Sequence, residues 1–567
     1  MAKAGENKLI FGDCLDVMLG ADDRGRPYIP DGSVDLVYLD PPFNSKANYN
    51  MIFGKGRDKQ AQMTAFTDTW QWGGQGTQDV AEIEGAVGHP AHRAIKGIYY
   101  TLGECGLMAY LGYMAKRLAV VHSKMKDTAS IYLHCDPTAG RYLGVVMDGI
   151  FGARNFQNQV AWKRTAGRSG SHRWGRVYDT ILLYTKSQTW TWNDQYEPLS
   201  KKSSLSPYRV KDSREKQFGP HQLISLTGPG VSKGESGEPW RGYDPAEQGR
   251  HWSAPFTGPY AEWIENNIIS GYLKIQGVHN RLNALLDADM IVWSKNKTPR
   301  LKRYLQAVKG ERINDFFADI PPESSHSKRR TGYPTQKPLP LLERLIQASS
   351  NPGDLVFDPF CGCGTTVAAA EGLDRRWIGI DISAAAVRIV TARPEIQAAQ
   401  YDIHGIPKGM EGARRLARLN RLQYERWAIS TVPGLAPNDR RNQEGFDGIG
   451  VFNEPIPDSP GKVKKQTVTA EVKSSKGGVT AAQRSHLKNH TSSNKSELGI
   501  FITLERDPAT EKWCNQQGHY QMPGAAVKYP KFQVFSAEQY FAGEKPDLPT
   551  LLDPLTGKPT QMQLSPS

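Results

Sequence analysis

The stretch that decides the fold reads DLVFDPFCGCGTT and spans residues 354–366. An apolar run ends at Asp358 and passes through a glycine-rich turn into a helical segment of small residues, TTVAAAEGL (365–373). Glycine lets the backbone approach a ligand closely, and the free amides at a helix N-terminus face anions. The next apolar run, RWIGIDI (376–382), carries Asp381. An acid about 20 residues after such a loop typically holds ribose hydroxyls. The sequence therefore favours a nucleotide-type cofactor site over a plain strand-to-helix turn.

Other segments of the chain predict the same fold class. Short apolar runs, which are typical of buried strands, are VDLVYLD (34–40), ASIYLHCD (129–136) and DTILLYTKS (179–187). Amphipathic helical patterns between them are YLGVVMDGIFG (142–152) and PLPLLERLIQASS (338–350). Strands that alternate with helices predict an α/β fold with an open, mostly parallel sheet.

Composition indicates several globular units and a polyanionic partner. A chain of 567 residues predicts three or four units at about 100–200 residues each. The net charge of +13 favours a polyanion such as a nucleic acid. No apolar run reaches the ~18–20 residues that cross a bilayer, and the N-terminus lacks the apolar core of a secretion signal. The six cysteines are too few for a disulfide framework, and no Cys/His cluster completes a zinc site. We expect structural thiols and a cytoplasmic location.

The segment LDPPFN (39–44) is a second candidate site. Pro41 and Pro42 fix a rigid turn directly after an apolar run. Asp40 and the Pro41 carbonyl would accept N–H bonds from a planar substrate with an amino group, while Phe43 would stack on its ring. Taken alone, the motif fits a strand-terminating turn equally well.

DPPF (40–43), TQKP (335–338) and DPFCGCGTT (358–366), in this order, resemble the motifs of the β group of DNA amino-methyltransferases. Members of that group methylate adenine N6 or cytosine N4 with S-adenosylmethionine. The resemblance covers about 1–200 and 320–400. It implies a permuted Rossmann-like methyltransferase with an inserted recognition domain, double-stranded DNA as the partner and a flipped target base. DPPF favours adenine, and cytosine N4 stays open.

The resemblance also implies roles for individual residues. Asp40, Pro41, Pro42 and Phe43 would hold the target amine, so that its nitrogen becomes pyramidal and attacks the methyl sulfonium in line. Asp381 would hold the ribose. Asp13 would contact the adenine amino group, and Gln336 with Lys337 would lie near the carboxylate end. Asp358, Phe360, Gly362, Thr365 and Thr366 would line the methionine side, and Cys14, Thr335 and Gly364 would also bind the cofactor.

We expect five segments along the chain. These are the catalytic half (1–190), the inserted recognition domain (191–325), the cofactor-binding half (326–405), a C-terminal unit (406–545) and a loose tail (546–567). The insertion is rich in Gly, Pro, Ser, Trp and basic residues. Within it, RHW (250–252) and KNKTPRLKR (295–303) would suit groove or phosphate contacts. For any single lysine, a solvated basic face is the simpler interpretation.

The C-terminal unit gives a separate signal. Asp447 precedes Glu471 and Lys473, and period-two alternation places the last two on one face of a strand. This pattern resembles the PD-(D/E)xK restriction-endonuclease-like fold of the Mrr type, over about 410–540. The resemblance implies that Asp447 and Glu471 bind Mg²⁺ with Lys473, supported by Glu425 and Gln483. An ordinary exposed strand, or a degenerate fold kept for DNA binding, would give the same pattern.

Three functions are therefore open at this point. The favoured one is a DNA amino-methyltransferase with a fused endonuclease-like domain that binds DNA. The alternatives are a bifunctional restriction-modification enzyme that cuts DNA with Mg²⁺, and a non-catalytic DNA-binding subunit. No G-x-x-x-x-G-K-[ST] motif occurs, so ATP-driven movement would need a separate restriction or motor subunit. Self-association is also open, and no membrane partner is expected.

Overall fold

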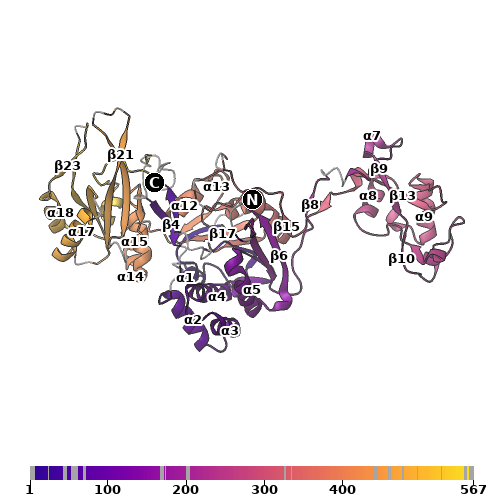
Figure 1. The fold of residues 1–567 in the computed structure, drawn as a ribbon, viewed down its shortest axis with the longest axis horizontal. Coiled ribbons are helices and arrows are strands. Elements are labelled where there is room, and N and C mark those ends of the chain that lie inside the picture. Colours follow the sequence, from indigo (N-terminus) through magenta and orange to yellow (C-terminus); the bar gives the residue numbers. More distant parts are fainter. Residues whose placement is uncertain are drawn as a thin grey trace. The chain divides into compact units, whose positions relative to one another are not determined.

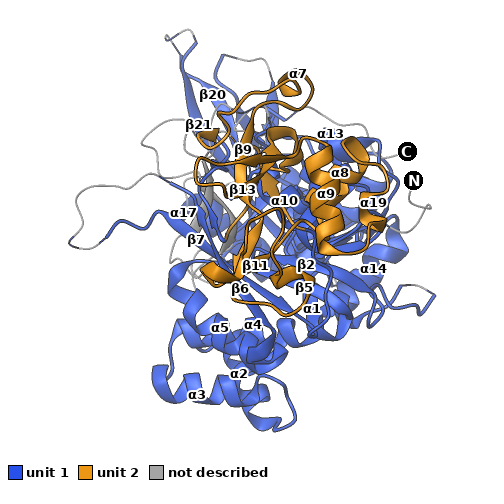
Figure 2. Cartoon of the chain, turned by 90° about the vertical axis from the view of Figure 1, so that its right-hand side faces the viewer, with its two compact units in different colours: residues 1–193, 315–567 blue, residues 194–314 orange. Residues whose placement is uncertain are grey.

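The computed structural model contains two compact units (Figures 1 and 2). The structure describes residues 7–560, except 23, 43–47, 53–61, 68–69, 71, 166–171, 173, 200–204, 325–326, 328, 332, 334, 439–444, 458, 460, 476–477, 494–495, 525–526 and 554–558. One unit comprises residues 1–193 and 315–567, and the other comprises 194–314. No helix in the described part of the chain is both long and apolar enough to cross a membrane.

A mostly parallel sheet forms the centre of the larger unit. From edge to edge, its described strands are β15 (Phe316–Phe317), β6 (Phe156–Lys163), β7 (Tyr178–Thr185), β5 (Met125–Cys135), β2 (Val34–Leu39), β16 (Leu355–Asp358), β17 (Arg376–Asp381), β1 (Lys8–Phe11) and β18 (Asp402–His404). Only β7 runs antiparallel to its neighbours in this sheet. The α/β class predicted from the sequence is confirmed, and β2 of the predicted catalytic half lies beside β16 of the cofactor half.

Helices flank this sheet. They are α1 (Cys14–Leu19), α2 (Gln75–Gly85), α3 (His92–Leu102), α4 (Gly106–Lys124), α5 (Pro137–Phe151), α10 (Leu339–Ser349), α11 (Thr365–Gly372), α12 (Ala384–Thr391) and α13 (Pro394–Gln397). A two-stranded hairpin consists of β3 (Asn48–Ile52) and β4 (Gln62–Thr67). The start of α5 is well specified, since the Asp136 side chain accepts from the amides of Thr138 and Ala139 and proline follows at the first helical position.

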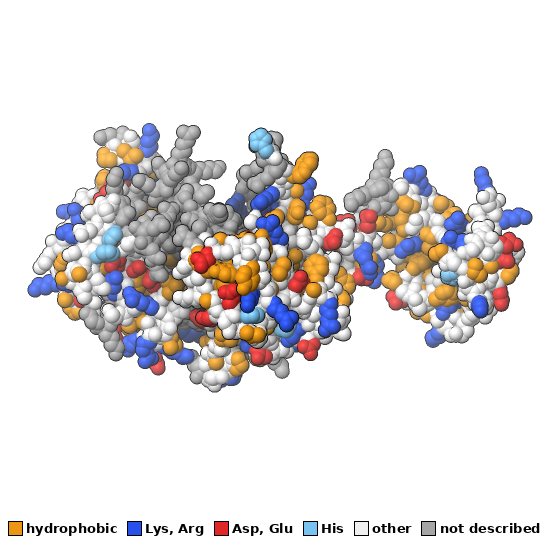
Figure 3. Space-filling view, turned by 60° about the horizontal axis from the view of Figure 1, so that its bottom comes forward, with side chains coloured by type: hydrophobic (Ala, Val, Ile, Leu, Met, Phe, Trp, Pro, Cys, Tyr) orange, Lys and Arg blue, Asp and Glu red, His pale blue; other side chains and the backbone are white. Residues whose placement is uncertain are grey.

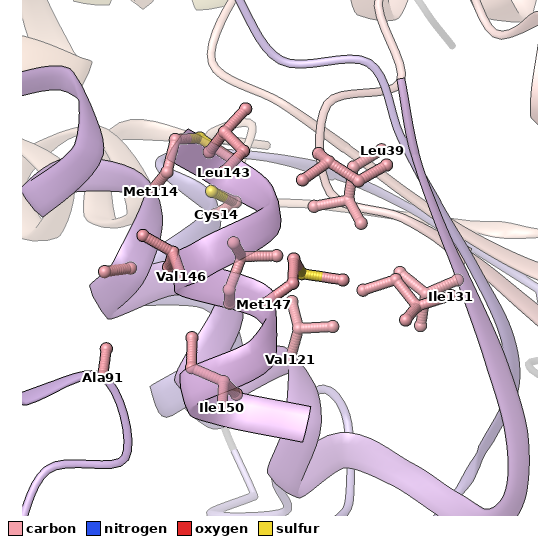
Figure 4. Close-up of a cluster of buried hydrophobic side chains, with 14 of the residues drawn as sticks. Cys14, Leu39, Ala91, Met114, Val121, Ile131, Leu143, Val146, Met147 and Ile150 are labelled. Atoms are coloured by element: carbon pink, nitrogen blue, oxygen red, sulfur yellow. The ribbon is translucent and has the colours of Figure 1, made fainter. Parts of the chain in front are cut away.

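The main hydrophobic core lies between the sheet and helices α4 and α5 (Figure 4). Leu39 and Ile131 on the strands pack into a cluster with Met114, Val121 and Met147 from the two helices, and all five are buried. Side chains of this size each gain roughly 1.5–3 kcal/mol from full burial. The core thereby fixes the strand ends from which the candidate site is built.

The smaller unit has its own core. Its sheets are β12 (Ile291–Trp293), β13 (Pro299–Tyr304) and β9 (His221–Ser225); β10 (Thr227–Pro229) with β11 (Arg250–Trp252); and β8 (Tyr196–Glu197) with β14 (Glu311–Arg312). Its α-helices are α7 (Glu215–Phe218), α8 (Pro259–Asn267) and α9 (Val278–Asp287). Aromatic side chains, among them Trp240 and Tyr304, are buried in its centre.

Two predictions about the insertion are wrong in part. Its boundaries are narrower than 191–325, because Phe316–Phe317 pairs with β6 and the Trp162 indole donates to the Ile320 carbonyl at 2.9 Å. Residues of the predicted groove contacts also belong to the core. Trp252 is buried and donates to the Glu238 carbonyl at 2.8 Å. Lys302 is buried and pairs with Asp212 and Asp289.

The C-terminal part forms a five-stranded sheet in the order β19 (Leu435–Pro437), β20 (Gly448–Pro455), β21 (Val463–Lys473), β22 (Leu498–Thr503) and β25 (Phe532–Ser536). The first three strands are antiparallel and the last three parallel. Its other elements are α14 (Met410–Leu419), α15 (Arg421–Ser430), α17 (Ala481–Ser493), α18 (Pro508–Asn515), α19 (Ala537–Phe541), β23 (His519–Gln521) and β24 (Lys528–Pro530).

This C-terminal part is not a separate compact unit, contrary to the boundary expected at 406. The physical reason is helix α15, which packs against both α12 and the C-terminal strands. Gln423 on this helix donates its side-chain amide to the Phe11 carbonyl at 2.7 Å. Asn420, just before the helix, donates to Asp16 at 3.3 Å.

The predicted loose tail is also wrong for residues 551–552. Leu551 forms an isolated β-bridge with Phe452, and Leu552 donates its amide to the Val451 carbonyl at 2.7 Å. Both leucine side chains are buried. Gly434 and Gly450 leave room for Leu551, since a Cβ on either would approach it within 3 Å. The apolar side chains therefore hold this segment against β20.

We expect Leu551→Ala to destabilise the C-terminal sheet by about 2–5 kcal/mol, because it removes a buried side chain and leaves a cavity. Leu419→Ala is the matched control: Leu419 is 74% exposed, so its loss should cost less than about 0.5 kcal/mol. Hydrogen exchange of the β20 amides measures both. Equal protection in the two variants would mean that the tail does not stabilise the sheet.

Candidate active site

The glycine-rich loop between β16 and α11 has the close approach that its sequence predicts. Gly362 and Gly364 have φ angles of 50° and 73°, in the left-handed region that favours glycine. A Cβ on Gly364 would lie 2.7 Å from the Val390 side chain. The Gly362 amide donates to Asp381 Oδ2 at 2.9 Å, so the acid at the end of β17 holds the loop in place.

A pocket opens at the carboxyl edge of β2, β16 and β17. It collects predicted residues from three distant stretches: Asp40 and Pro42; Thr335, Gln336 and Lys337; and Asp358, Phe360, Gly362, Thr365, Thr366 and Asp381. Parallel strands end at the same edge, and ligands of such sheets bind there. The structure therefore brings most of the predicted catalytic and cofactor residues together. Phe43 lies outside the described residues.

Two acids of the pocket have shifted pKa values. Burial raises the pKa of Asp358 to about 7, although hydrogen bonds from Thr366 and from the Phe360 amide act in the opposite direction. Burial likewise raises the pKa of Asp381 to about 6, against hydrogen bonds from the amides of Ser383 and Gly362. Strongly shifted acids in a cleft are typical of functional sites, because a ligand is expected to compensate their burial.

Lys337 makes a contact that the sequence does not predict. Its ammonium group donates to Asp40 Oδ2, and the lysine side chain is buried. The other carboxylate oxygen, Asp40 Oδ1, is buried without a hydrogen-bond partner among the described residues. An unpaired buried acceptor is costly, so this oxygen is suited to a ligand donor. Lys337 thus adjoins the predicted amine-binding carboxylate as well as the predicted cofactor end.

Asp13 and Cys14 are placed differently from the other predicted residues. Neither lines the pocket among the described residues. The Asp13 carboxylate caps α1 by accepting the Leu15 amide at 2.8 Å, and it accepts two bonds from Arg117 at 2.8 and 2.9 Å. Arg117 is buried with its guanidinium 3.3 Å from the centre of the Tyr113 ring. Cys14 is part of the hydrophobic core. The adenine contact of Asp13 and the cofactor-binding role of Cys14 therefore stay predictions.

Two tyrosines line the pocket without having been predicted. Tyr38 lies two residues before Asp40, so strand alternation places both on the same face of β2. That spacing was the available signal. Tyr333 lies just before the TQKP segment, and its ring would be 3.2 Å from a Cβ on Gly362. Sequence spacing alone gives no signal for that contact.

The predicted C-terminal site comes together only in part. Glu471 is buried and contacts Lys473 at 3.0 Å and His486, which was not predicted, at 2.8 Å. Asp447 Oδ2 instead accepts the Val472 amide at 2.8 Å, and Gln483 Oε1 accepts the Thr480 amide at 2.9 Å. Among the described residues, no three His, Cys, Asp or Glu side chains gather in a way that could hold a metal ion. The predicted Mg²⁺ site does not fit this arrangement.

Because the folded chain holds the Asp358 proton to about pH 7, its stability should fall as pH rises from about 4 to about 7. Below this window, the unfolded chain is protonated as well and the effect disappears. Asp358→Asn has no such proton, so its advantage over the wild type should grow to about 4 kcal/mol by pH 8. Denaturant unfolding at pH 5 and pH 8, without ligands, measures this. Asp127→Asn, at a side chain 91% exposed, should follow the wild type at both pH values. A wild-type pH slope in Asp358→Asn would contradict the prediction.

Comparison with known proteins identifies the family. A family model described as "DNA methylase", for N6 and N4 methyltransferases, matches residues 34–392. The type II methyltransferase M.EcaI of Enterobacter cloacae is 32% identical over 289 residues, which are 50% of this chain and 57% of that protein. The StyLTI Mod subunit, from a type III restriction-modification enzyme of Salmonella typhimurium, is 24% identical over 386 residues, 66% of this chain and 51% of that protein.

A shorter match, 45% identical over 76 residues, is to the DNA adenine methyltransferase YhdJ of Escherichia coli; it covers 13% of this chain and 26% of that protein. The chain spans about half the length of the first two relatives. Among solved structures, the cytosine-N4-specific PvuII DNA methyltransferase is 14% identical, with a TM-score of 0.30 over 71% of this chain and 98% of that one. Since the family model matches more than half of the chain, this protein belongs to the N6/N4 DNA methylase family.

Proposed function

We propose that the chain is a site-specific DNA methyltransferase that transfers a methyl group from S-adenosylmethionine to an exocyclic amino group, most favourably adenine N6. One observation carries the proposal. The pocket joins the Asp40 carboxylate, with its unpartnered oxygen, to the glycine-rich loop and to Asp381. An acceptor for an amine and a loop suited to a nucleoside therefore adjoin one another.

The described residues fit the proposed cofactor. Gly362 and Gly364 keep side chains away from the loop. Asp358 supplies a buried acid and Asp381 a half-buried one, at the ends of neighbouring strands. When bound, S-adenosylmethionine supplies an electrophilic methyl group on a cationic sulfur. A cation close to Asp358 and Asp381 would favour their ionised forms and offset the burial that raises their pKa values.

The protein's part in the reaction is to hold and activate the amine. Asp40 Oδ1 would accept one N–H bond, and Pro41 would offer its carbonyl for the second. Lys337 donates to Asp40 Oδ2, which leaves Oδ1 as the acceptor for the amine. With both protons bound in this way, the nitrogen lone pair is less delocalised and can attack the methyl carbon. The amine reaches the pocket only if the base leaves the duplex.

Adenine is favoured over cytosine by the DPPF motif and by the similarity to a relative named as a DNA adenine methyltransferase. For the unit 194–314, we propose target recognition. Lys295 and Lys297 are exposed there, whereas Lys302 is used inside the fold. Figure 3 shows Lys and Arg side chains on both units, mixed with acidic ones. Exposed Lys and Arg side chains of this kind would contact DNA mainly at its phosphates and so position it.

Methyl transfer to duplex DNA should fall at least about 10²-fold in Asp40→Asn, because the neutral amide accepts a weaker bond from the amine. Asp127→Asn is the control for loss of a carboxylate, since that side chain is exposed and outside the pocket. Labelled methyl groups in DNA measure the rate, and digestion to nucleosides separates N6-methyladenine from N4-methylcytosine. Undiminished transfer by Asp40→Asn would refute the mechanism, and labelled cytosine would refute the preference for adenine.

We also propose a second function, in which the C-terminal part acts on DNA as an endonuclease-like unit. The observation that favours it is the order of elements from α15 through three antiparallel strands to α17 and β22, with Glu471 and Lys473 on one face of β21. The described side chains do not form a metal site, so a metal has no part in this proposal. The relative named as a Mod subunit supports the competing proposal of a separate restriction subunit.

Cleavage by this unit should be visible as nicked or linear plasmid after incubation with the full chain, tested with and without Mg²⁺. Unmodified DNA and DNA previously methylated by the chain serve as the two substrates. Lys473→Ala should abolish cleavage, and Lys464→Ala, at an exposed lysine on the same strand, should leave it unchanged. If the wild type cuts neither substrate, the C-terminal part does not act as a nuclease on its own.

A further inference from the structure

A hydrogen-bond network of buried polar side chains begins at the pocket and has no part in the mechanism described so far. Tyr38 on β2, His134 on β5 and Asp179 on β7 lie on three neighbouring strands. The Tyr38 hydroxyl is 2.9 Å from His134 Nδ1, and His134 Nε2 is 3.2 Å from Asp179 Oδ2. All three residues are at most 3% exposed.

The hydrogen bonds of this network all have the same direction. A carboxylate only accepts, so His134 Nε2 carries the proton that bonds to Asp179. Burial lowers the pKa of His134 and favours the neutral ring. In a neutral imidazole the second nitrogen is an acceptor, so the Tyr38 hydroxyl donates to Nδ1. Donors therefore point away from the pocket at each link.

The two ends of this hydrogen-bond network lie in different surroundings. At the inner end, Tyr38 and Asp40 line the same pocket from the same strand. At the outer end, the Arg164 guanidinium lies 3.5 Å from Asp179, and the Arg164 side chain is 50% exposed. The network thus connects the pocket of the predicted amine-binding carboxylate with a residue that reaches solvent.

A purely structural role does not require such residues. Burying titratable groups costs free energy unless each is hydrogen-bonded, and apolar side chains of similar size often pack as well. Tyr132, on the same strand as His134, shows the simpler solution, since its buried hydroxyl bonds to the Ser349 hydroxyl at 2.7 Å. The Tyr38 network instead continues through two further titratable groups.

We propose that Tyr38, His134 and Asp179 form a proton relay, which carries the proton released by methyl transfer from the pocket to solvent. The proposal rests on the function proposed above. The amine nitrogen bonds to the methyl carbon through its lone pair, and the bond from that carbon to the cofactor sulfur breaks with both electrons left on sulfur. The nitrogen then carries one proton too many, and Asp40 accepts it.

The relay returns Asp40 to its ionised form. One proton passes from Asp40 to the Tyr38 oxygen across the pocket that both residues line, while the Tyr38 proton moves to His134 Nδ1. The His134 Nε2 proton moves to Asp179, from which it leaves to water beside Arg164. Each residue gains one proton and loses one, so the sum is a single proton delivered to solvent. After these steps His134 carries its proton on Nδ1. Once the product has left and water can enter the pocket, one proton from water at Asp179 returns to Nε2, the Nδ1 proton returns to Tyr38, and Tyr38 releases one proton to the water in the pocket, which restores the starting tautomer.

Asp179→Asn separates this relay from a structural role. The asparagine carbonyl still accepts the bond from His134, but it cannot take up a proton. We expect the single-turnover rate of methyl transfer to fall about 10²-fold, with unfolding midpoint and DNA affinity unchanged. Wild-type rates in mixtures of H₂O and D₂O should depend on the deuterium fraction along a curve, since several protons move, and Asp179→Asn should give a straight line.

Tyr38→Phe breaks the relay at its first link and should lower the rate to a similar extent. Tyr132→Phe is its matched control, because it also removes one buried hydroxyl from this sheet but none from the relay. A third readout needs neither cofactor nor DNA: ¹⁵N NMR of the free chain should show His134, assigned with His134→Gln, as the neutral tautomer protonated at Nε2.

Three results would overturn the relay. These are a wild-type rate and isotope dependence in Asp179→Asn, equal effects of Tyr38→Phe and Tyr132→Phe, and rate losses that only parallel losses of stability or DNA affinity. Failure of the proposed function gives a different result, since the wild-type chain would then transfer no methyl group to DNA at all.

Discussion

The parallel pairing of β2 with β16 is the constraint on which the site depends. Leu36 lies opposite Val356 and Val37 opposite Phe357, although more than 300 residues separate the two strands. Parallel strands in register end at one edge, so Asp40 and Asp358 necessarily emerge on the same side of the sheet. Asp381 joins them because β17 is the next strand. A one-residue slip would turn these side chains to the opposite face.

This convergence brings three acidic side chains together, and their surroundings in the pocket differ. Asp40, Asp358 and Asp381 are close enough for Asp40 and Asp381 each to raise the pKa of Asp358. Lys337 donates to Asp40, so this carboxylate receives a cation, while burial raises the pKa values of the other two. Without a ligand, the arrangement is costly on the side of the glycine-rich loop. A cationic ligand there would lower that cost, whereas an anionic one would increase it.

The sequence predicts the backbone of the site better than its side-chain contacts. Apolar runs that end in Asp40, Asp358 and Asp381 indicate strands and their carboxyl ends, and parallel strands then bring these acids together. The contact between Lys337 and Asp40 depends on where the segment before α10 crosses the pocket, which no local pattern encodes. For the same reason Trp252, in a stretch that resembles a surface motif, is buried by tertiary packing. The contact of His134 with Asp179 requires that β7 pair antiparallel with β5, and the strand patterns do not specify that pairing.

Helix α15 explains why the C-terminal part cannot be treated as an independent module. Trp427 on this helix is buried and stacks on Phe541 of the C-terminal part, with ring centres 5.8 Å apart. One turn earlier, Gln423 bonds to the Phe11 carbonyl, and the Gly12 amide beside it donates to the backbone carbonyl of Asp381 at 3.0 Å. A Cβ on Gly12 would lie 2.9 Å from Val17 and 3.2 Å from Gln423, so glycine is needed for the helix to approach this closely. The same helix therefore supports the C-terminal sheet and the strand ends that carry the pocket. Packed side chains on one helix therefore join the two, whichever activity the C-terminal part has.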